Sequence, residues 1–147
     1  MFQTAYTFGR FNIPHRGHLA LLEEMRSLGH NVVVGVSTAE GNAPLGMRLA
    51  YLRKLAPWAT FIPVNSIFSL PTSEDVVVFG QDQEHLADAI SDYSGCSTFL
   101  LQRSLKAPSS TACRKAFRQQ DILSLVELIP SKLIEEAESL WLTSIFP

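Results

Sequence analysis

Two histidines three residues apart, His15 and His18, flank Gly17 near the start of the chain. They follow a short apolar run at 5–8 and precede a segment with the apolar periodicity of a helix from about Leu19. They therefore lie where a first strand gives way to a first helix. In an open α/β sheet this corner binds nucleotide phosphates, because the helix N-terminus offers free N–H groups and the positive end of a dipole. These residues predict an anion-binding corner, in which Gly17 lets a phosphate approach the backbone.

A second polar group lies late in the chain at 109–114, Ser-Ser-Thr-Ala-Cys-Arg. It follows an apolar run at 98–101, and its serines can cap a helix that begins at residue 109 or 110. Hydroxyl and N–H groups at a helix start suit a pyrophosphate, and Arg114, one turn later, can add a charged hydrogen-bond fork. Cations crowd this part of the chain: Arg103, Lys106, Arg114, Lys115 and Arg118. The cluster predicts a phosphate-facing patch, and a solvated helix face is the plainer alternative.

Residues 9–18 also match a longer pattern, Gly-x-Phe-x-x-Pro-His-x-Gly-His. This pattern resembles the first signature of the nucleotidyltransferase superfamily, also called cytidylyltransferase-like, and residues 109–114 resemble its second signature, Ser-x-Thr-x-x-Arg. Between them, Gly80-Gln81-Asp82 follows an apolar run at 76–79 and resembles the Gly-x-Asp of the nicotinate and nicotinamide mononucleotide adenylyltransferases. The two signatures bracket most of the chain in the expected order. The likeness is strongest to the short nicotinamide mononucleotide adenylyltransferases.

The resemblance implies an enzyme that joins a nucleoside triphosphate to a phosphorylated small molecule and releases pyrophosphate. Such a direct transfer depends on positioning and charge neutralisation, since no covalent enzyme intermediate forms. By resemblance, His18 contacts the α-phosphate, His15 helps to bind the β- and γ-phosphates, and Arg114 contacts the leaving pyrophosphate. Mg²⁺ is expected as a largely hydrated ion held by the substrate, because the sequence contains no cluster of acidic residues that would supply protein ligands for it. The residues expected to bind the nucleotide are Gly9, Arg10, Phe11, Gly17, Gly80, Asp82, Ser109, Ser110 and Thr111.

Plainer structural roles exist for several of these residues. His15 and His18 could form a structural zinc pair, although no Cys or carboxylate lies at ligand spacing. Asp82 and the hydroxyl groups at 109–111 could serve only as helix caps. Arg10 could form a surface salt bridge, but its place in the motif favours phosphate contact.

Apolar runs of strand length alternate with helical periodicity along the chain. Strands are expected at about 4–9, 31–36, 59–64, 75–79 and 97–101. Helices are expected at about 17–28, between the 38–46 loop and Pro57, at 84–92, and from residue 109 or 110 onward. Two further short helices, divided at Pro130, are expected within 122–145. This alternation predicts an α/β fold, a Rossmann-like open sheet of about five mostly parallel strands with helices on both faces. We expect one nucleotidyltransferase domain over residues 1–147, on which the helices from about 122 pack. The irregular segment 65–74 is a candidate substrate-contacting loop.

The composition limits the partners and the location of the protein. A net charge of −2 gives no general attraction for nucleic acid, so nucleic-acid binding is not expected. No apolar run is long enough to span a bilayer, no signal peptide is recognised, and Cys96 and Cys113 lack metal-binding spacing. These features predict a soluble, cytoplasmic protein with free thiols. Cys113 could act as a nucleophile, but we expect a buried helix residue because nucleotidyl transfer needs no thiol.

The acceptor and the base of the triphosphate are the features that the sequence determines least. The resemblance favours ATP and nicotinamide mononucleotide. The alternatives are a pantetheine-phosphate adenylyltransferase, a glycerol-phosphate-type cytidylyltransferase that uses CTP, and a non-catalytic nucleotide-binding regulator. Class I aminoacyl-tRNA synthetases have a similar His-x-Gly-His corner, but a chain of 147 residues has no room for tRNA-binding parts.

No residue pattern in the sequence determines the oligomeric state. Relatives are commonly dimers or hexamers, so a homo-oligomer is expected. The apolar residues near the C-terminus, at 140–142 and 145–146, could form a subunit contact or could cover the core of the monomer.

Overall fold

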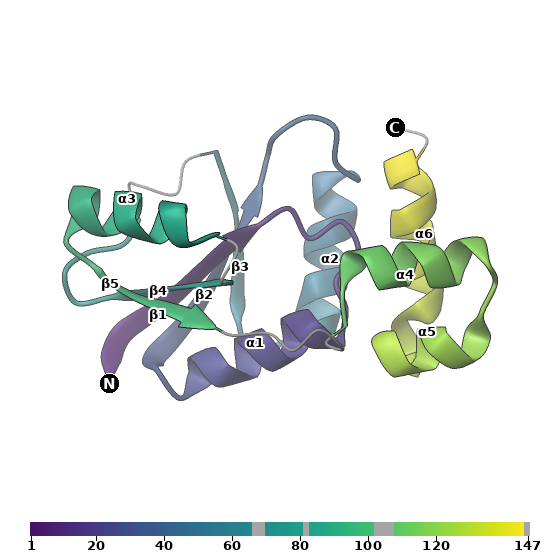
Figure 1. The fold of residues 1–147 in the computed structure, drawn as a ribbon, viewed down its shortest axis with the longest axis horizontal. Coiled ribbons are helices and arrows are strands. Elements are labelled where there is room, and N and C mark those ends of the chain that lie inside the picture. The colour runs from purple at the N-terminus through teal and green to yellow at the C-terminus, as the bar shows by residue number, and fades with distance from the viewer. Residues whose placement is uncertain (66–69, 81–82, 102–107, 146–147) are drawn as a thin grey trace.

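The computed structural model of the protein describes residues 1–65, 70–80, 83–101 and 108–145. Five strands form one sheet: β1 (Phe2–Gly9), β2 (Gly29–Ser37), β3 (Thr60–Val64), β4 (Val76–Gly80) and β5 (Ser97–Leu101). They lie in the order β3-β2-β1-β4-β5, and the four neighbouring pairs are all parallel (Figure 1). The predicted open sheet of parallel strands is confirmed. Its strand order reverses direction between β1 and β4, which is where open α/β sheets bind ligands.

Helices cover both faces of this sheet, as predicted. The helices of the described chain are α1 (Arg16–Arg26), α2 (Leu45–Leu55), α3 (Glu84–Ser94), α4 (Ser110–Arg118), α5 (Ile122–Leu128) and α6 (Ile134–Ile145), with a 3₁₀ turn at Ser131–Leu133. On β4, Val76 and Val78 belong to the larger core under α1 and α2, whereas Val77 and Phe79 belong to a smaller core under α3. This alternation follows from the two-residue period of a strand, which turns successive side chains to opposite faces.

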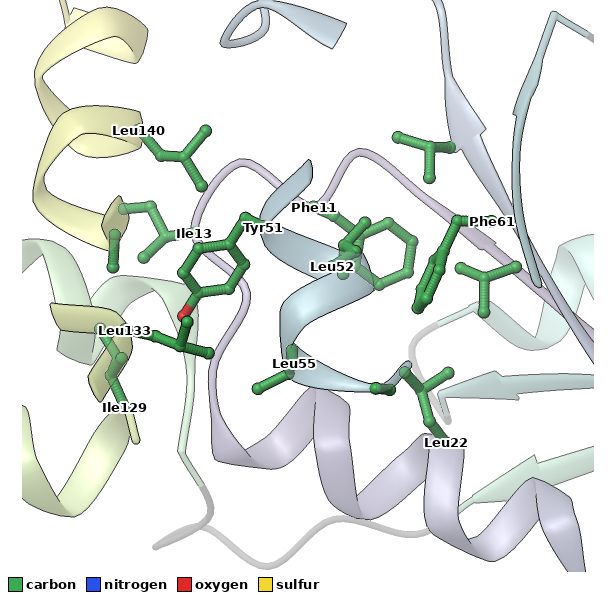
Figure 2. Packing of buried hydrophobic residues seen from close by; sticks show 14 of the residues in the cluster. Phe11, Ile13, Leu22, Tyr51, Leu52, Leu55, Phe61, Ile129, Leu133 and Leu140 are labelled. Carbon is green, nitrogen blue, oxygen red and sulfur yellow. The ribbon is translucent and has the colours of Figure 1, made fainter. Parts of the chain in front are cut away.

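The C-terminal helices lie beside α2 at the end of the molecule away from α3 (Figure 1). Ile13 from the loop after β1 and Tyr51 from α2 pack among residues of these helices, and Figure 2 shows Ile129, Leu133 and Leu140 around them. The Tyr51 hydroxyl donates to the Pro14 carbonyl oxygen at 2.9 Å, so this buried polar group is satisfied. Through Ile13 and Pro14, the loop that carries the first motif is therefore anchored in the main core.

Several element boundaries differ from the predicted ones. β1 and β2 are longer than predicted, because their parallel pairing continues from Phe2 opposite Gly29 to Gly9 opposite Val36. Gly29 begins β2 instead of merely following the first helix, and a Cβ there would lie 2.6 Å from the Ala5 nitrogen. α1 ends at Arg26, earlier than predicted, since Ser27 serves as its C-cap.

The predicted start of β4 at Asp75 is also displaced, to Val76. The Asp75 carboxylate is 4% exposed and accepts hydrogen bonds from the Thr4 backbone N–H at 3.2 Å and from the Thr72 backbone N–H at 2.8 Å. These bonds hold the turn before β4 against β1, so Asp75 closes the turn and does not belong to the strand. The candidate substrate loop at 65–74 lies partly outside the described residues, which omit 66–69.

The apolar C-terminal residues that the structure describes face mainly inward. Leu140 is 1% exposed, and the Trp141 ring stacks on Phe117 with centroids 5.3 Å apart, whereas Leu142 is 43% exposed. Phe146 lies outside the described residues. The predicted homo-oligomer stays a prediction. Within the described ranges, no helix has the length and apolar character needed to cross a membrane.

Candidate active site

A cavity of about 410 Å³ opens at the C-terminal ends of β1 and β4, where the strand order reverses. β1 contributes Thr7, Phe8 and Gly9 to its wall, and β4 contributes Gly80. Because parallel strands place their carboxyl ends at one edge of the sheet, the loops that follow β1 and β4 meet here. The remaining wall comes from the loop after β1, from α1, from the start of α3, from β5 and from α4: Arg10, Phe11, Asn12, Gly17, His18, Leu21, Gln83, Leu101, Ser110 and Arg114.

The cavity brings together most of the candidate residues that the two motifs and the Gly-x-Asp sequence supplied. Those that line it are Gly9, Arg10, Phe11, Gly17, His18, Gly80, Ser110 and Arg114. The two motifs are far apart in the sequence, yet α1 and α4 both begin at this cavity. Asp82 lies outside the described residues, as do Arg103 and Lys106 of the predicted cationic patch.

The two motif histidines cap the start of α1 and bind each other's backbone. His15 has extended backbone as the N-cap residue, and its Nδ1 accepts from the Gly17 N–H at 3.0 Å. The Nδ1 of His18 accepts from the His15 N–H at 3.2 Å, which completes a reciprocal capping box. A neutral imidazole that accepts at Nδ1 carries its proton on Nε2. Both rings are thereby fixed as Nε2–H donors.

The two histidines differ in their access to the cavity. His18 lines the cavity, while His15 is 1% exposed and lies behind it, with the two ring centroids 3.9 Å apart. Of the two histidines, His18 is therefore the one that an anion in the cavity can reach. The contact of His15 with a triphosphate stays a prediction, and the role that the structure gives His15 is to cap α1 and support His18.

Phe11 also packs against the His18 ring. Its backbone has a φ of 54°, in the left-handed region that non-glycine residues seldom adopt, and its side chain is 7% exposed. The ring meets His18 edge-on, with centroids 5.0 Å apart. It also covers Gly9, where a Cβ would lie 2.9 Å from the Phe11 ring. Glycine at position 9 leaves the space that the Phe11 ring occupies, so packing explains both residues of the motif.

Packing also explains why residue 17 is a glycine. A Cβ at Gly17 would lie 2.9 Å from the Pro108 carbonyl oxygen and 2.8 Å from the His15 ring. The start of α1 is therefore pressed against the segment that leads into α4. The close approach of a phosphate at Gly17 stays a prediction, but the glycine is already required for the two helix starts to meet.

The start of α4 presents a different set of groups. Ser109 is the N-cap, and its hydroxyl oxygen accepts from the Ala112 N–H at 3.1 Å. Ser110 and Arg114, one helical turn apart, both line the cavity. Thr111 is exposed and does not line it. Lys115 and Arg118 are also exposed, so among the described cations of the predicted patch Arg114 is the one at the cavity.

Cys113 is a buried helix residue, as expected. Its side chain is fully buried, and burial raises the pKa of its thiol to about 11. The neighbouring Arg114 guanidinium acts in the opposite direction on this pKa but has the smaller effect. A thiol of this kind stays protonated at neutral pH and is a poor nucleophile.

The described residues that line the cavity include no carboxylate to hold Mg²⁺. No Asp or Glu is among the described residues that line it, and nowhere in the described ranges do three or more His, Cys, Asp and Glu side chains gather as metal ligands. Mg²⁺ prefers carboxylate and phosphate oxygens, so the phosphates of a substrate are the fitting ligands here. The predicted Mg²⁺ requirement stays a prediction.

Sequence reasoning missed the polar residues that hold the loop after β1. Asn12 lines the cavity and binds the loop that follows β2, and Arg48 of α2 is 2% exposed. The sequence does carry a signal for Arg48. It precedes Tyr51, Leu52 and Leu55 at helical spacings of three, four and seven residues, which places an arginine on the apolar face of α2. A charged side chain is seldom buried without a partner, so the spacing indicates that Arg48 has a buried hydrogen-bond or ion-pair partner.

Comparison with known proteins agrees with this fold. A profile described as Cytidylyltransferase-like matches residues 6–116. A Vibrio parahaemolyticus protein named as a nicotinate-nucleotide adenylyltransferase superposes with a TM-score of 0.66 at 14% identity, covering 96% of both chains. The nicotinic acid mononucleotide adenylyltransferase of Plasmodium falciparum, solved with NaAD, gives a TM-score of 0.69 at 12% identity over 97% of this chain and 98% of that one.

A third solved structure, a bifunctional NMN adenylyltransferase/ADP ribose pyrophosphatase from Francisella tularensis, gives a TM-score of 0.68 at 11% identity, with 97% of this chain matching 52% of that one. Comparison with curated proteins finds no match. At these identities the solved structures establish the fold, and the profile establishes the family. With both polar motifs inside the matched region and both helix starts at one cavity, the chain belongs to the cytidylyltransferase-like family of nucleotidyltransferases.

Proposed function

We propose that the protein is an adenylyltransferase that joins ATP to nicotinamide mononucleotide, with nicotinate mononucleotide as the nearest alternative acceptor. The observation that carries the proposal is the meeting of two helix starts at one cavity. α1 brings His18 and α4 brings Ser110 and Arg114. A cavity that faces two helix N-termini and a guanidinium suits a chain of phosphates better than it suits an apolar ligand.

The proposed reaction is a direct displacement at the α-phosphorus of ATP. An oxygen of the acceptor phosphate attacks, the bond from the α-phosphorus to the bridging oxygen breaks, and pyrophosphate leaves with the bonding electrons. Negative charge grows on the α-phosphate oxygens and on the leaving group. His18 would donate its Nε2–H to the α-phosphate, while the Arg114 guanidinium and the Ser110 hydroxyl would bind the pyrophosphate. His15 would act through the capping box that orients His18.

Support for a pyridine mononucleotide comes from the three solved neighbours, whose names refer to nicotinate, nicotinic acid or NMN adenylyltransferases. Gly80 at the end of β4, the first residue of the Gly-x-Asp sequence, lines the cavity and is consistent with this choice. Phosphopantetheine with ATP, glycerol phosphate with CTP, and nucleotide binding without catalysis are the alternatives.

Pyrophosphate release tests the proposal. The purified protein is incubated with Mg²⁺ and either ATP or CTP, each against nicotinamide mononucleotide, nicotinate mononucleotide, phosphopantetheine and glycerol-3-phosphate. Release with ATP and a pyridine mononucleotide supports the proposal. Release only with CTP, or only with another acceptor, overturns the proposed substrates. The absence of release from every pair, with ATP binding intact, overturns the enzymatic proposal in favour of a nucleotide-binding regulator.

A further inference from the structure

Arg48 is a buried cation whose hydrogen-bond partners are backbone carbonyls. Its Nε donates to the Ala43 carbonyl oxygen at 2.7 Å, and its Nη1 donates to the carbonyl oxygens of Arg10 at 2.8 Å and Ser37 at 2.9 Å. Across the described ranges, no carboxylate lies within ion-pair distance of it. Burial lowers the pKa of Arg48 from its usual range, which marks the cost of holding this charge out of water.

The three carbonyls belong to different segments at the carboxyl edge of the sheet. Arg10 lies in the loop after β1, Ser37 ends β2, and Ala43 lies just before α2. A planar guanidinium with several fixed donors can bind such a set simultaneously, which a lysine ammonium on a flexible stem does less well. Arg48 therefore joins the loop of the first motif to the neighbouring strand and loop.

Asn12 makes a second connection between the same two loops. Its Oδ1 accepts from the Ala43 N–H at 2.9 Å, and its Nδ2 donates to the Asn42 Oδ1 at 2.8 Å. Ala43 is thereby bound at its N–H by Asn12 and at its carbonyl by Arg48. Two independent polar contacts at one residue hold the loop after β1 against the loop before α2.

The Arg10 carbonyl links this network to His18. It forms the peptide group that leads into Phe11, whose left-handed backbone places its ring against the His18 imidazole. Fixing the Arg10 carbonyl fixes the plane of that peptide, and with it the direction in which the Phe11 side chain leaves the backbone. Arg48 itself does not line the cavity.

We propose that Arg48 is a positioning residue, which holds the loop after β1 so that Phe11 keeps the His18 imidazole aimed into the cavity. The proposal rests on the proposed function, because His18 is the group that it positions. It accounts for a buried arginine that packing alone does not require.

The test compares three variants on α2. Arg48→Met keeps a long side chain without donors, and Arg48→Lys keeps the charge without the fork. Leu55→Ala is the matched control, since Leu55 is buried in the same helix and core but its aliphatic side chain cannot hydrogen-bond to the loop network. Arg48→Met and Leu55→Ala should both lower the midpoint of thermal unfolding. Measured below that midpoint, only Arg48→Met should lower kcat for pyrophosphate release, by roughly ten- to a hundredfold, as expected for a misplaced catalytic group.

The second readout does not depend on turnover. The His18 ring lies edge-on to the Phe11 ring with centroids 5.0 Å apart, so we expect its proton resonances to carry a ring-current shift. These resonances are assigned by their loss in His18→Gln. In Arg48→Met these resonances should move, whereas in Leu55→Ala they should stay in place. Arg48→Lys should give an intermediate change in both kcat and resonance. If Arg48→Met does not fold, Arg48→Lys carries the test alone.

Wild-type kcat and unmoved His18 resonances in the folded Arg48 variant would overturn the positioning role. A loss of kcat of equal size in Leu55→Ala would overturn it as well, since a general loss of packing would then explain the effect. If the wild-type protein releases no pyrophosphate from any substrate pair, the proposed function fails, and the resonances still decide whether Arg48 positions His18.

Discussion

The starts of α1 and α4 face the same cavity but are constructed differently. At α1, two histidine rings cap the helix reciprocally, and Phe11 packs against His18, so the imidazole at the cavity is held from several sides. At α4, one serine caps the helix, and Ser110 and Arg114 extend from it toward the cavity. The difference matches what each end would have to do in the proposed reaction. A group at the reacting phosphorus needs an accurate position, whereas a group that binds a leaving pyrophosphate mainly needs charge and donors.

Removing His18 should have the largest effect on turnover. His18→Ala deletes the Nε2–H donor at the cavity, and we expect pyrophosphate release to fall about a hundredfold or more, as for other preorganised donors. Its lost cap bond should cost about 1 kcal/mol of stability, which leaves the protein folded. Turnover and thermal unfolding of the same preparation check both expectations. A His18→Ala protein with wild-type turnover would contradict the assignment of the α1 start to the reacting centre.

Removing Arg114 should have the next largest effect and should appear in a different parameter. Arg114→Ala deletes a charged fork at the cavity, so we expect kcat/KM for ATP to fall roughly tenfold or more. Lys115→Ala is the matched control, because this neighbouring cation is exposed and does not line the cavity. Steady-state kinetics at fixed ionic strength separate the two. Equal losses in both variants would indicate a general surface potential and would contradict a specific contact at Arg114.

The contact between the two helix starts can be disturbed at Gly17. In Gly17→Ala the new methyl group would meet the Pro108 carbonyl and the His15 ring, so we expect a loss of about 1–3 kcal/mol in the free energy of unfolding together with reduced turnover. Gly46 offers the control, since it lies in α2 with no atom within 4 Å of an added Cβ. Gly46→Ala should instead stabilise the protein by about 0.5–1 kcal/mol. Urea unfolding of both variants checks the pair, and a neutral Gly17→Ala would show that the helix starts are not in tight contact.

The cap at α4 should matter least for catalysis. Ser109 does not line the cavity, so the structure supports its cap role and not the predicted contact with the nucleotide. Ser109→Ala removes the hydroxyl that accepts from Ala112, and we expect about 1 kcal/mol lower stability with turnover within a factor of about two of wild type. His15→Ala removes a cap of the same kind at α1 but also the support of His18, so it should lower both stability and turnover. The two variants are compared by urea unfolding and pyrophosphate release. If both variants lose stability but keep wild-type turnover, catalysis does not depend on the cap of α1 more than on the cap of α4.

Much of the fold was predictable because its signals are local. Alternating strand and helix patterns indicated a parallel α/β sheet, and the caps at His15 and Ser109 lie where the motifs placed helix starts. The boundaries of β1 and β4 were less accurate. They depend on pairing with β2 and on the hydrogen bonds of Asp75, which join residues distant in the sequence.

The sequence by itself determined that the His-x-Gly-His and Ser-x-Thr motifs would stand at helix starts, because residue type, spacing and helix caps are properties of short segments. Only the tertiary structure decided which of their residues share one cavity. Ser110 and Arg114 line it with His18, while Thr111 does not and His15 lies behind it. The structure also decided the contacts of Arg48, since its carbonyl partners come from separate segments and no local spacing encodes them. Contacts between distant segments exist only after the sheet has brought the ends of its strands together.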